Sequence, residues 1–281
     1  MKTGLKLIAA LTASLVMTLP ALSQTKQPTQ QALSKESVIE TIKERGVMKV
    51  GLSLFTPWAI RAKNGELIGF EIDVAKKLAA DMGVDVEFYP TAWDGIIPAL
   101  IAGNFDVIIS GMSVTAQRNM TVNFTDNYST TGVQLVANKK LTEGKKSLED
   151  FNDPSVTFAG RRGATTSVAV TDNFPKAKLV LFDDERAAIQ ELIDGRAAAI
   201  LDTPPNPARY AREYPDTIYL PFPDIDFDKR GEGFAVRKGD IDALNFFNNW
   251  IAQEWRTDWL KKRHDYWFTT DGWYDQVDSP N

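Results

Sequence analysis

The chain has 281 residues, of which 43% are hydrophobic and 25% charged; this is the composition of a soluble globular protein with room for two lobes. Its formal net charge of −5 argues against a nucleic-acid-binding groove, which needs a basic face. With no cysteine and one histidine, His264, the chain has no disulfides or thiolate metal sites, and any catalysis would depend on carboxylates, hydroxyls or lysine.

The first 23 residues are typical of a secretory signal peptide. Lys2 and Lys6 precede an apolar run that ends near Pro20, and the sequence ALS supplies a cleavage site before Gln24. The run is short for a membrane span, and no other stretch approaches ~20 apolar residues. Because no cysteine stands at the cleavage point, we expect a periplasmic protein without a lipid anchor, in which residues 24–36 form a flexible leader.

From Ser37 to Ser110, strands and helices alternate. Helices are expected at 37–46, 71–83 and 93–103, each ending at a glycine, and strands at 47–54, 84–90 and 105–110. Asn64 and Gly65 mark a hairpin turn before the second helix. This alternation indicates a parallel sheet that helices cover on both faces.

The same plan returns in the second half of the chain. A strand, a glycine turn and a helix are expected over 155–174, followed by a strand at 177–182, a helix at 184–196 and a strand at 197–202. The chain continues with a strand at 233–238 and an aromatic-rich helix pair at 240–267. Two copies of one α/β plan predict two similar lobes.

The ends of the repeated plan set the expected domain boundaries. We predict that residues 37–135 and 230–281 form lobe 1 and that residues 136–229 form lobe 2. The chain would then cross between the lobes twice, near 133–138 and 228–236. Ligands of such folds bind in the cleft at the carboxyl ends of the strands.

Four segments resemble family 3 of the bacterial extracellular solute-binding proteins, which serve amino-acid ABC importers. They are GFEIDVAKKLAADM at 69–82, GNFDVIISGMSVTAQR at 103–118, RRGATTS at 161–167 and GRAAAILD at 195–202. They occur in the family's order and spacing, over about residues 37–270. The resemblance implies a type II periplasmic binding protein-like α/β fold, in which each lobe is a mostly parallel sheet flanked by helices and the lobes close at a hinge around one small ligand.

The resemblance also implies a site for the α-carboxylate of an amino acid. Arg118 and Ser113 would bind the carboxylate from lobe 1, and Thr165 with the N–H groups near Thr166 would bind it from lobe 2. Arginine suits this role because its fork offers two parallel charge-assisted donors. Hydroxyls and the N–H groups at a helix start complete an anion site.

The α-ammonium needs acceptors, and the resemblance assigns this role to Asp202 and the Gly111 carbonyl. The family often has a side-chain hydroxyl where this chain has Gly111, so one hydrogen bond of the family's pattern is missing here. Taken without the resemblance, Asp202 also fits a turn former at a strand end. Phe55 and Trp93 fall where the family places the aromatic walls of the site.

Other conspicuous residues have plainer interpretations. We expect Trp58 in the core and the C-terminal Trp250, Trp255, Trp259 and Trp267 in helix packing. Arg161 and Arg162 replace a neutral residue that usually precedes the glycine; we expect one of them to face solvent, and either could reach an acidic ligand side chain. Asp224, Asp226 and Asp228 imitate a calcium loop but lack its glycine and distal glutamate, so a solvated turn is expected.

The predicted function is that of a non-enzymatic, monomeric binding protein, without cofactor or metal, that delivers a polar amino acid to the membrane permease of an ABC importer; cationic, amide and acidic ligands all remain open. The main alternative is a periplasmic cyclohexadienyl (arogenate or prephenate) dehydratase on the same fold. By resemblance its general acid would be a glutamate where this chain has Ser167, and no other carboxylate lies in that segment. A periplasmic sensor lobe, a third possibility, would act through a separate partner.

Overall fold

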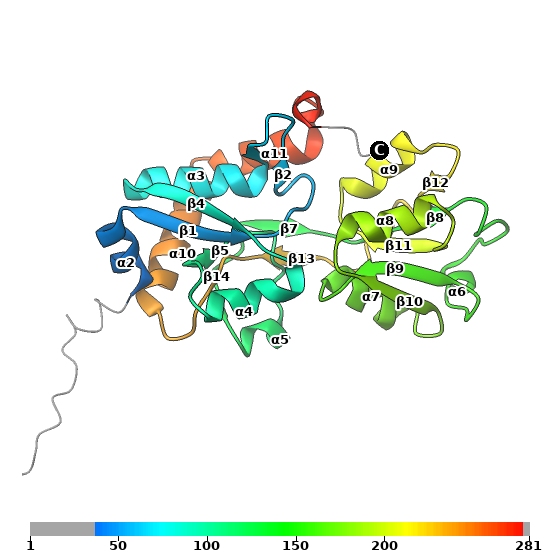
Figure 1. The fold of residues 1–281 in the computed structure, drawn as a ribbon. Coiled ribbons are helices and arrows are strands. Elements are labelled where there is room, and N and C mark those ends of the chain that lie inside the picture. The colour runs from blue at the N-terminus through cyan, green and yellow to red at the C-terminus, as the bar shows by residue number, and fades with distance from the viewer. Residues whose placement is uncertain (1–36, 278–281) are drawn as a thin grey trace, which may run out of the picture.

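The computed structural model describes residues 37–277 and shows two lobes joined by a pair of extended strands (Figure 1). The predicted signal peptide and leader lie outside the described residues. Each lobe is built on a five-stranded sheet with helices on both faces. Within residues 37–277, no helix is both long and apolar enough to span a membrane.

The sheet of lobe 1 has the strand order β4-β1-β5-β14-β6. Its strands are β1 (Val47–Leu52), β4 (Asp85–Pro90), β5 (Val107–Ile108), β6 (Asn123–Phe124) and β14 (Ala235–Val236). β1 pairs with β4 and β5 in parallel, whereas β14 runs antiparallel to β5 and β6. The predicted parallel sheet is therefore mixed, because the strand that returns from lobe 2 enters it from the opposite end.

The helices of lobe 1 follow the predicted boundaries closely. α2 (Val38–Arg45) begins at the side-chain cap Ser37 and ends at Gly46, and α3 (Phe70–Met82) ends at Gly83. The third predicted helix is divided into the 3₁₀ turn η1 (Trp93–Gly95) and α4 (Ile96–Ile101). The hairpin of β2 (Ile60–Arg61) and β3 (Leu67–Ile68) contains the predicted Asn64-Gly65 turn, and α5 (Ala116–Asn119) was not predicted.

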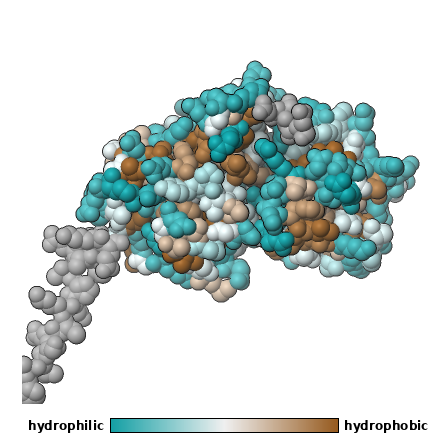
Figure 2. Space-filling view, viewed as in Figure 1, coloured by the Kyte–Doolittle hydropathy of each residue, from teal (hydrophilic) through white to brown (hydrophobic). Residues whose placement is uncertain are grey.

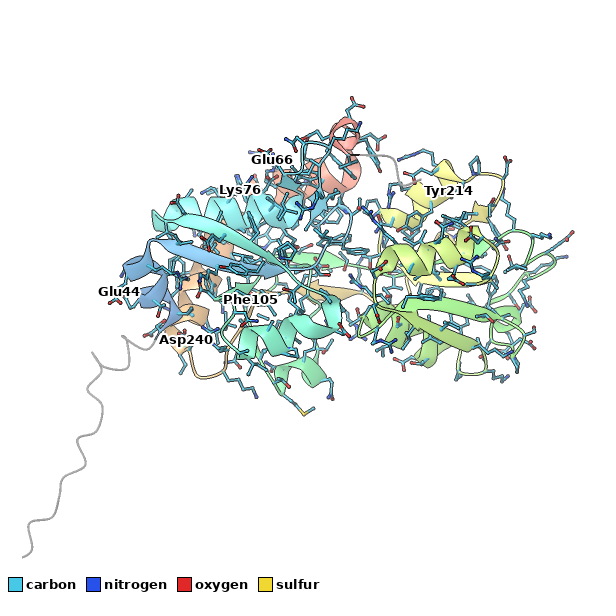
Figure 3. The ribbon with its side chains drawn as sticks, viewed as in Figure 1. Glu44, Glu66, Lys76, Phe105, Tyr214 and Asp240 are labelled. Atoms are coloured by element: carbon cyan, nitrogen blue, oxygen red, sulfur yellow. The ribbon has the colours of Figure 1, made fainter. Side chains whose placement is uncertain are left out.

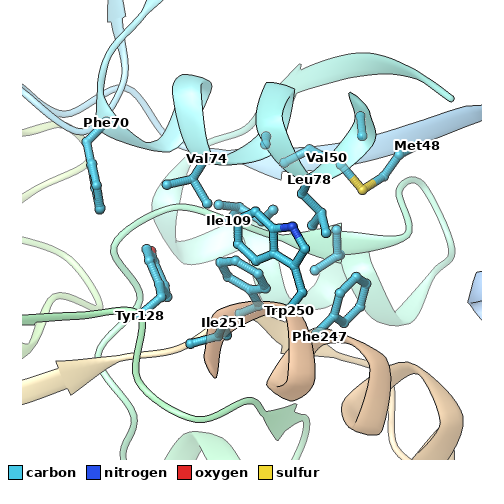
Figure 4. Packing of buried hydrophobic residues seen from close by; sticks show 14 of the residues in the cluster. Met48, Val50, Phe70, Val74, Leu78, Ile109, Tyr128, Phe247, Trp250 and Ile251 are labelled. Carbon is cyan, nitrogen blue, oxygen red and sulfur yellow. The ribbon is translucent and has the colours of Figure 1, made fainter. Parts of the chain in front are cut away.

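The C-terminal helices α10 (Ile241–Arg256) and α11 (Trp259–Thr269), which precede the short turn η2 (Tyr274–Gln276), pack on lobe 1. Figure 4 shows side chains of α10 turned toward the sheet and toward α3. Its labelled residues Phe247, Trp250 and Ile251 belong to one buried cluster with Met48, Val50, Phe70, Val74, Leu78, Ile109 and Tyr128. Trp250 and Trp267 are buried as expected, but Trp255 is 41% exposed. The prediction for Trp255 was wrong because this side chain lies off the buried stripe of α10, and its indole N–H donates to the Asn127 carbonyl.

The start of the described chain is tied to α10. Asp240, labelled in Figure 3, accepts hydrogen bonds from the Ser37 hydroxyl (2.8 Å) and from the Val38 N–H (2.7 Å). It also caps α10 by accepting from the Ala243 N–H. One carboxylate thus accepts hydrogen bonds at the starts of two helices, although Ser37 and Asp240 are 203 residues apart in the sequence.

The sheet of lobe 2 has the strand order β10-β9-β11-β8-β12. Its strands are β8 (Gln134–Asn138), β9 (Thr157–Arg161), β10 (Lys178–Phe182), β11 (Ala199–Asp202) and β12 (Ile218–Tyr219). β9 pairs with β10 and β11 in parallel, and β8 runs antiparallel to β11 and β12. The lobe repeats the mixed plan of lobe 1, as the sequence repeat indicated.

Helices cover both faces of this second sheet. α6 (Leu148–Phe151) and α7 (Thr165–Asn173) lie against one face, where Phe158 is buried. α8 (Glu185–Ile193) and α9 (Asn206–Glu213) lie against the other, where the neighbouring Ala159 is buried. This alternation along β9 follows the two-residue period of a strand. α9 was not predicted; it follows two prolines, which obscured its start.

The two lobes are connected by β7 (Ser129–Thr131) and β13 (Arg230–Glu232), which pair antiparallel to each other (Figure 1). Gln134, four residues after the middle of β7, is already hydrogen-bonded into the sheet of lobe 2. On the face in view in Figure 2, the brown hydrophobic patches of both lobes are separated by teal hydrophilic residues. The fold prediction, two α/β lobes with a double connection, is confirmed.

Candidate functional site

A cavity lies between the lobes, beside the two connecting strands. Of the eight residues that the sequence indicated, seven line it: Phe55, Trp93, Gly111, Ser113, Thr165, Thr166 and Asp202. The eighth, Arg118, does not line the cavity. These residues lie at or just after the carboxyl ends of β1, β4, β5, β9 and β11, which is the edge of a parallel sheet where ligands bind.

The wall on lobe 1 is largely aromatic. Phe55 stacks on Trp58 with ring centroids 4.6 Å apart, and Trp58 is buried, as expected for a core residue. Trp93 lies at the start of η1 and donates its indole N–H to the Gly163 carbonyl of lobe 2 at 3.1 Å. The wall therefore combines apolar surface with a direct hydrogen bond across the cleft.

The turn after β5 presents its backbone to the cavity without room for a side chain at Gly111. This glycine has a φ of +56°, and a Cβ on it would lie 2.5 Å from the Trp58 ring. Its N–H donates to the Glu71 carboxylate at 2.9 Å. The side-chain hydroxyl common in the family could not be accommodated here, which gives a physical reason for this departure from the family pattern.

Ser113 and Thr165 face each other across the cleft, with their hydroxyl oxygens 3.3 Å apart. Arg118 lies beside them: its guanidinium donates to the Ser113 carbonyl (2.9 Å) and to the Gly163 carbonyl (3.0 Å) and lies over the Trp93 ring. Burial lowers the pKa of Arg118 to about 10, and the neighbouring Arg161 and Arg230 add to this effect. In this closed arrangement Arg118 bridges the two lobes.

The wall on lobe 2 supplies N–H groups and a buried carboxylate. Thr165 and Thr166 begin α7, whose first backbone N–H groups have no partner within the helix. Asp202 ends β11 and is 1% exposed; one of its oxygens accepts from the Thr203 N–H, the Tyr210 hydroxyl lies near the carboxyl group, and Oδ2 makes no hydrogen bond of normal geometry with a described residue. Burial, and then the nearby Glu185, raise the pKa of Asp202 well above its ordinary value.

Several charged residues in the cavity wall were not predicted: Glu185, Asp228, Arg230 and Glu232. Asp224 and Asp226 are exposed, as expected for a solvated turn, but Asp226 also accepts from the Val133 N–H, and Asp228 is half-buried in an ion pair with Arg230. Asp228 therefore folds back onto the connecting strand β13, and the expectation was wrong for this residue. In residues 37–277, no group of three or more acidic or histidine side chains is placed to hold a metal ion.

The two adjacent arginines have different surroundings. Arg162 is exposed and pairs with Asp183 on the surface, so one of the pair faces solvent as expected. Arg161 is 6% exposed and lines the cavity. A residue at the end of β9, before the glycine turn, reaches the cleft by its position, but the sequence alone could not tell which of two neighbours points inward.

Comparison with known proteins places this chain in one family. Residues 48–270 match the bacterial extracellular solute-binding proteins, family 3. The chain belongs to this family. The L-cystine-binding protein TcyJ of Escherichia coli is 28% identical over 86% of this chain and 90% of its own length. The family resemblance found in the sequence is therefore confirmed.

A solved structure and an enzyme are also similar to the chain. A binding component of an ABC transporter from Wolinella succinogenes, crystallised with lysine, is 34% identical, with a TM-score of 0.76 over 82% of this chain and 99% of that one. The cyclohexadienyl dehydratase of Pseudomonas aeruginosa is 24% identical over 83% of this chain and 87% of its own length. The family fold therefore occurs in both binding proteins and an enzyme.

The position predicted for a dehydratase general acid is turned away from the cavity. Ser167 is buried in lobe 2, where its hydroxyl donates to the Arg161 carbonyl at 2.8 Å. A hydroxyl there has no acidic proton to give. Carboxyls with raised pKa values do line the cavity elsewhere: burial raises the pKa of Glu232 to about 7, and burial also raises that of Glu185.

Proposed function

We propose that this chain is the periplasmic substrate-binding protein of an ABC importer and that it binds one amino acid between its closing lobes. The observation that carries this proposal is Asp202, a buried carboxyl group that lines the cavity and whose Oδ2 makes no hydrogen bond of normal geometry with a described residue, although the Tyr210 hydroxyl lies near the group. A carboxylate in this position suits the α-ammonium of an amino acid, because a buried charge needs a partner of opposite sign.

The α-carboxylate of the ligand would lie on the other side of this arrangement. Ser113 and Thr165 offer hydroxyls from the two lobes, the start of α7 offers N–H groups, and Arg118 adds a positive charge beside them. Donors for an anion and an acceptor for a cation thus lie in one cavity. Ligand contacts from both lobes would stabilise the closed state over the open one.

The partner in this proposal is the membrane permease, which would recognise the closed, loaded protein. The protein would act as a monomer in the periplasm, after removal of the signal peptide. Neither a metal nor a cofactor has a part in this function. The predicted non-enzymatic role rests on Ser167, whose hydroxyl occupies the position of the dehydratase acid and is turned into lobe 2.

The test is a thermal-shift screen of the refolded, ligand-free mature chain against the twenty amino acids, opines, polyamines, arogenate and prephenate. At 100 times its dissociation constant a ligand adds ~2.7 kcal/mol of stability, which raises the melting temperature by a few degrees. A shift with one group of amino acids supports the proposal. A shift with arogenate or prephenate alone, followed by product formation, would show that the protein is an enzyme.

A further inference from the structure

The guanidinium of Arg161 lies against the aromatic wall of the cavity, where the side chain of a ligand could otherwise pack. It is 4.6 Å from the ring centroid of Trp93 and 5.1 Å from that of Phe55. Both rings belong to lobe 1, whereas Arg161 ends β9 in lobe 2. A residue of the protein thus crosses the cleft and covers the aromatic faces with a positive charge.

The polar contacts of Arg161 leave hydrogen-bonding capacity unused. Among the described residues it forms an ion pair with Glu185 alone, whose Oε2 lies 3.5 Å from the Arg161 Nε. The buried Nε donates no hydrogen bond to a described residue. A guanidinium has five N–H donors and cannot lose its proton in a protein. Since Arg161 lines the cavity, the remaining donors are available to a ligand there.

A ligand with a cationic side chain would compete for the same place. Ammonium and guanidinium groups bind the faces of Trp and Phe rings, and those faces already hold Arg161. The ligand cation would also meet a like charge within a buried site and would find Glu185 already paired. Both effects disfavour lysine and arginine as ligands.

We propose that Arg161 is a specificity-determining residue: its guanidinium, held between Phe55 and Trp93, excludes cationic amino acids and selects amino acids whose side chain ends in a hydrogen-bond acceptor. This inference rests on the proposed function and narrows it. Of the other charged residues of the cavity, Asp228 pairs with Arg230, Glu232 accepts from the Trp58 indole and the Thr131 hydroxyl, and Asp202 remains for the α-ammonium. The acceptor is the oxygen of a side-chain carboxylate or of a side-chain amide.

The experiment is calorimetry of the full mature chain with glutamate, glutamine, arginine, lysine and leucine. In the wild-type protein, glutamate or glutamine binds at least about tenfold more tightly than the other three, and comparison of these two separates a carboxylate from an amide acceptor. In Arg161→Ala the preference reverses: the acceptor ligand loses about tenfold, and arginine or lysine gains about tenfold, because the vacated aromatic faces now adjoin an unpaired Glu185.

Three further proteins make the result specific. Arg162→Ala removes the exposed neighbouring arginine and leaves the ligand preference unchanged. Glu185→Gln leaves Arg161 in place and gives no gain for arginine. The double variant Arg161→Ala/Glu185→Gln loses most of the gain seen in Arg161→Ala, since the carboxylate that would pair with the ligand cation is gone. Melting curves and circular dichroism establish that each variant is folded.

Two outcomes would overturn the inference. If arginine, lysine or leucine binds the wild-type protein as tightly as glutamate and glutamine, Arg161 does not select the ligand. If a folded Arg161→Ala protein keeps the wild-type order of affinities, the guanidinium has no part in selection. Failure of every amino acid to bind either protein would instead contradict the proposed function itself, so the two failures are distinguishable.

Discussion

The two walls of the cleft are chemically unlike. Lobe 1 contributes Phe55, Trp93 and Ser113, which carry no charge, whereas lobe 2 contributes Arg161, Glu185 and Asp202. The apolar wall excludes water, and the charges on the facing wall act more strongly where water is excluded. Under the proposed function, the charges of lobe 2 would therefore act most strongly on a ligand when the lobes are closed.

The difference follows from which elements end at the cleft. On lobe 2, β9 ends in Arg161, β11 ends in Asp202, and α8 begins with Glu185, a favourable place for a carboxylate because of the helix dipole. On lobe 1, Phe55 lies in the loop after β1, and Trp93 begins the 3₁₀ turn η1. Arg118 is the exception, a charge of lobe 1 that reaches the Gly163 carbonyl of lobe 2.

The largest expected effect is that of Arg118→Ala, which removes the one charged side chain assigned above to the wall of lobe 1. The variant keeps its fold but binds the amino-acid ligand more weakly by about 3 kcal/mol, roughly a hundredfold, because the closed state loses both the hydrogen bonds to Ser113 and Gly163 and the charge near the ligand carboxylate. Calorimetry with the ligand identified by the thermal-shift screen measures this.

Arg118→Lys is the matched variant for this prediction. A lysine keeps the charge but cannot donate in two fixed directions, so its affinity falls between those of the wild type and the alanine variant. Equal affinities for wild type and Arg118→Ala would remove Arg118 from the site and leave lobe 1 with an uncharged wall throughout.

Much of this organisation could be predicted from the sequence. Glycines after α2 and α3 marked the helix ends, because Gly46 and Gly83 adopt the left-handed conformation that ends a helix. Ser113 and Asp202 were predicted as site residues because the segments that contain them resemble the family's, and both lie at the ends of apolar strands. These are local signals, and they do not depend on tertiary contacts.

The remainder depended on contacts that only the folded chain makes. Glu232 sits in a connecting strand whose sequence, RGE, carries no strand pattern, and it reaches the cavity because β13 pairs with β7. Glu185 looked like an ordinary first-turn acid of an amphipathic helix. The inward turn of Arg161, and the outward turn of Arg162, follow from the pleat of β9, which two adjacent arginines cannot reveal.

The second prediction tests the charged wall. Asp202→Asn weakens ligands that carry an α-ammonium by about 2 kcal/mol, since a charge-assisted hydrogen bond becomes a neutral one, while des-amino analogues of the same ligand lose far less. Calorimetry with both members of the pair gives the difference directly. An equal loss for both analogues would move Asp202 out of the site and would leave the ammonium to another carboxylate of the cavity.

The smallest expected effect concerns Glu232, which belongs to the connecting strands and so to neither wall. It accepts hydrogen bonds from the Trp58 indole (3.3 Å) and the Thr131 hydroxyl (3.2 Å), and burial raises its pKa from the ordinary value of 4.5 to about 7. The folded protein therefore holds a proton on Glu232 that the unfolded chain has already lost. Glu71, a buried neighbour, has its pKa raised first by burial and then by the charge of Glu232.

The sign of the resulting pH dependence follows from this proton. A carboxyl group whose pKa is raised by folding contributes stability that is complete below the pKa of the unfolded chain and is lost as the pH rises through the pKa of the folded state. Because of Glu232, the free energy of unfolding therefore falls by ~1.4 kcal/mol per pH unit between about pH 5 and 7. Glu232→Gln removes this contribution and flattens the slope. It also removes the charge that raises the pKa of Glu71, so the slope that remains reports Glu71 with its pKa raised by burial alone. Denaturant unfolding of the ligand-free proteins at several pH values measures the two slopes. Parallel slopes would mean that Glu232 is ionised in the folded protein near neutral pH, and the connecting strands would then add a negative charge to the floor of the cleft between an uncharged wall and a charged one.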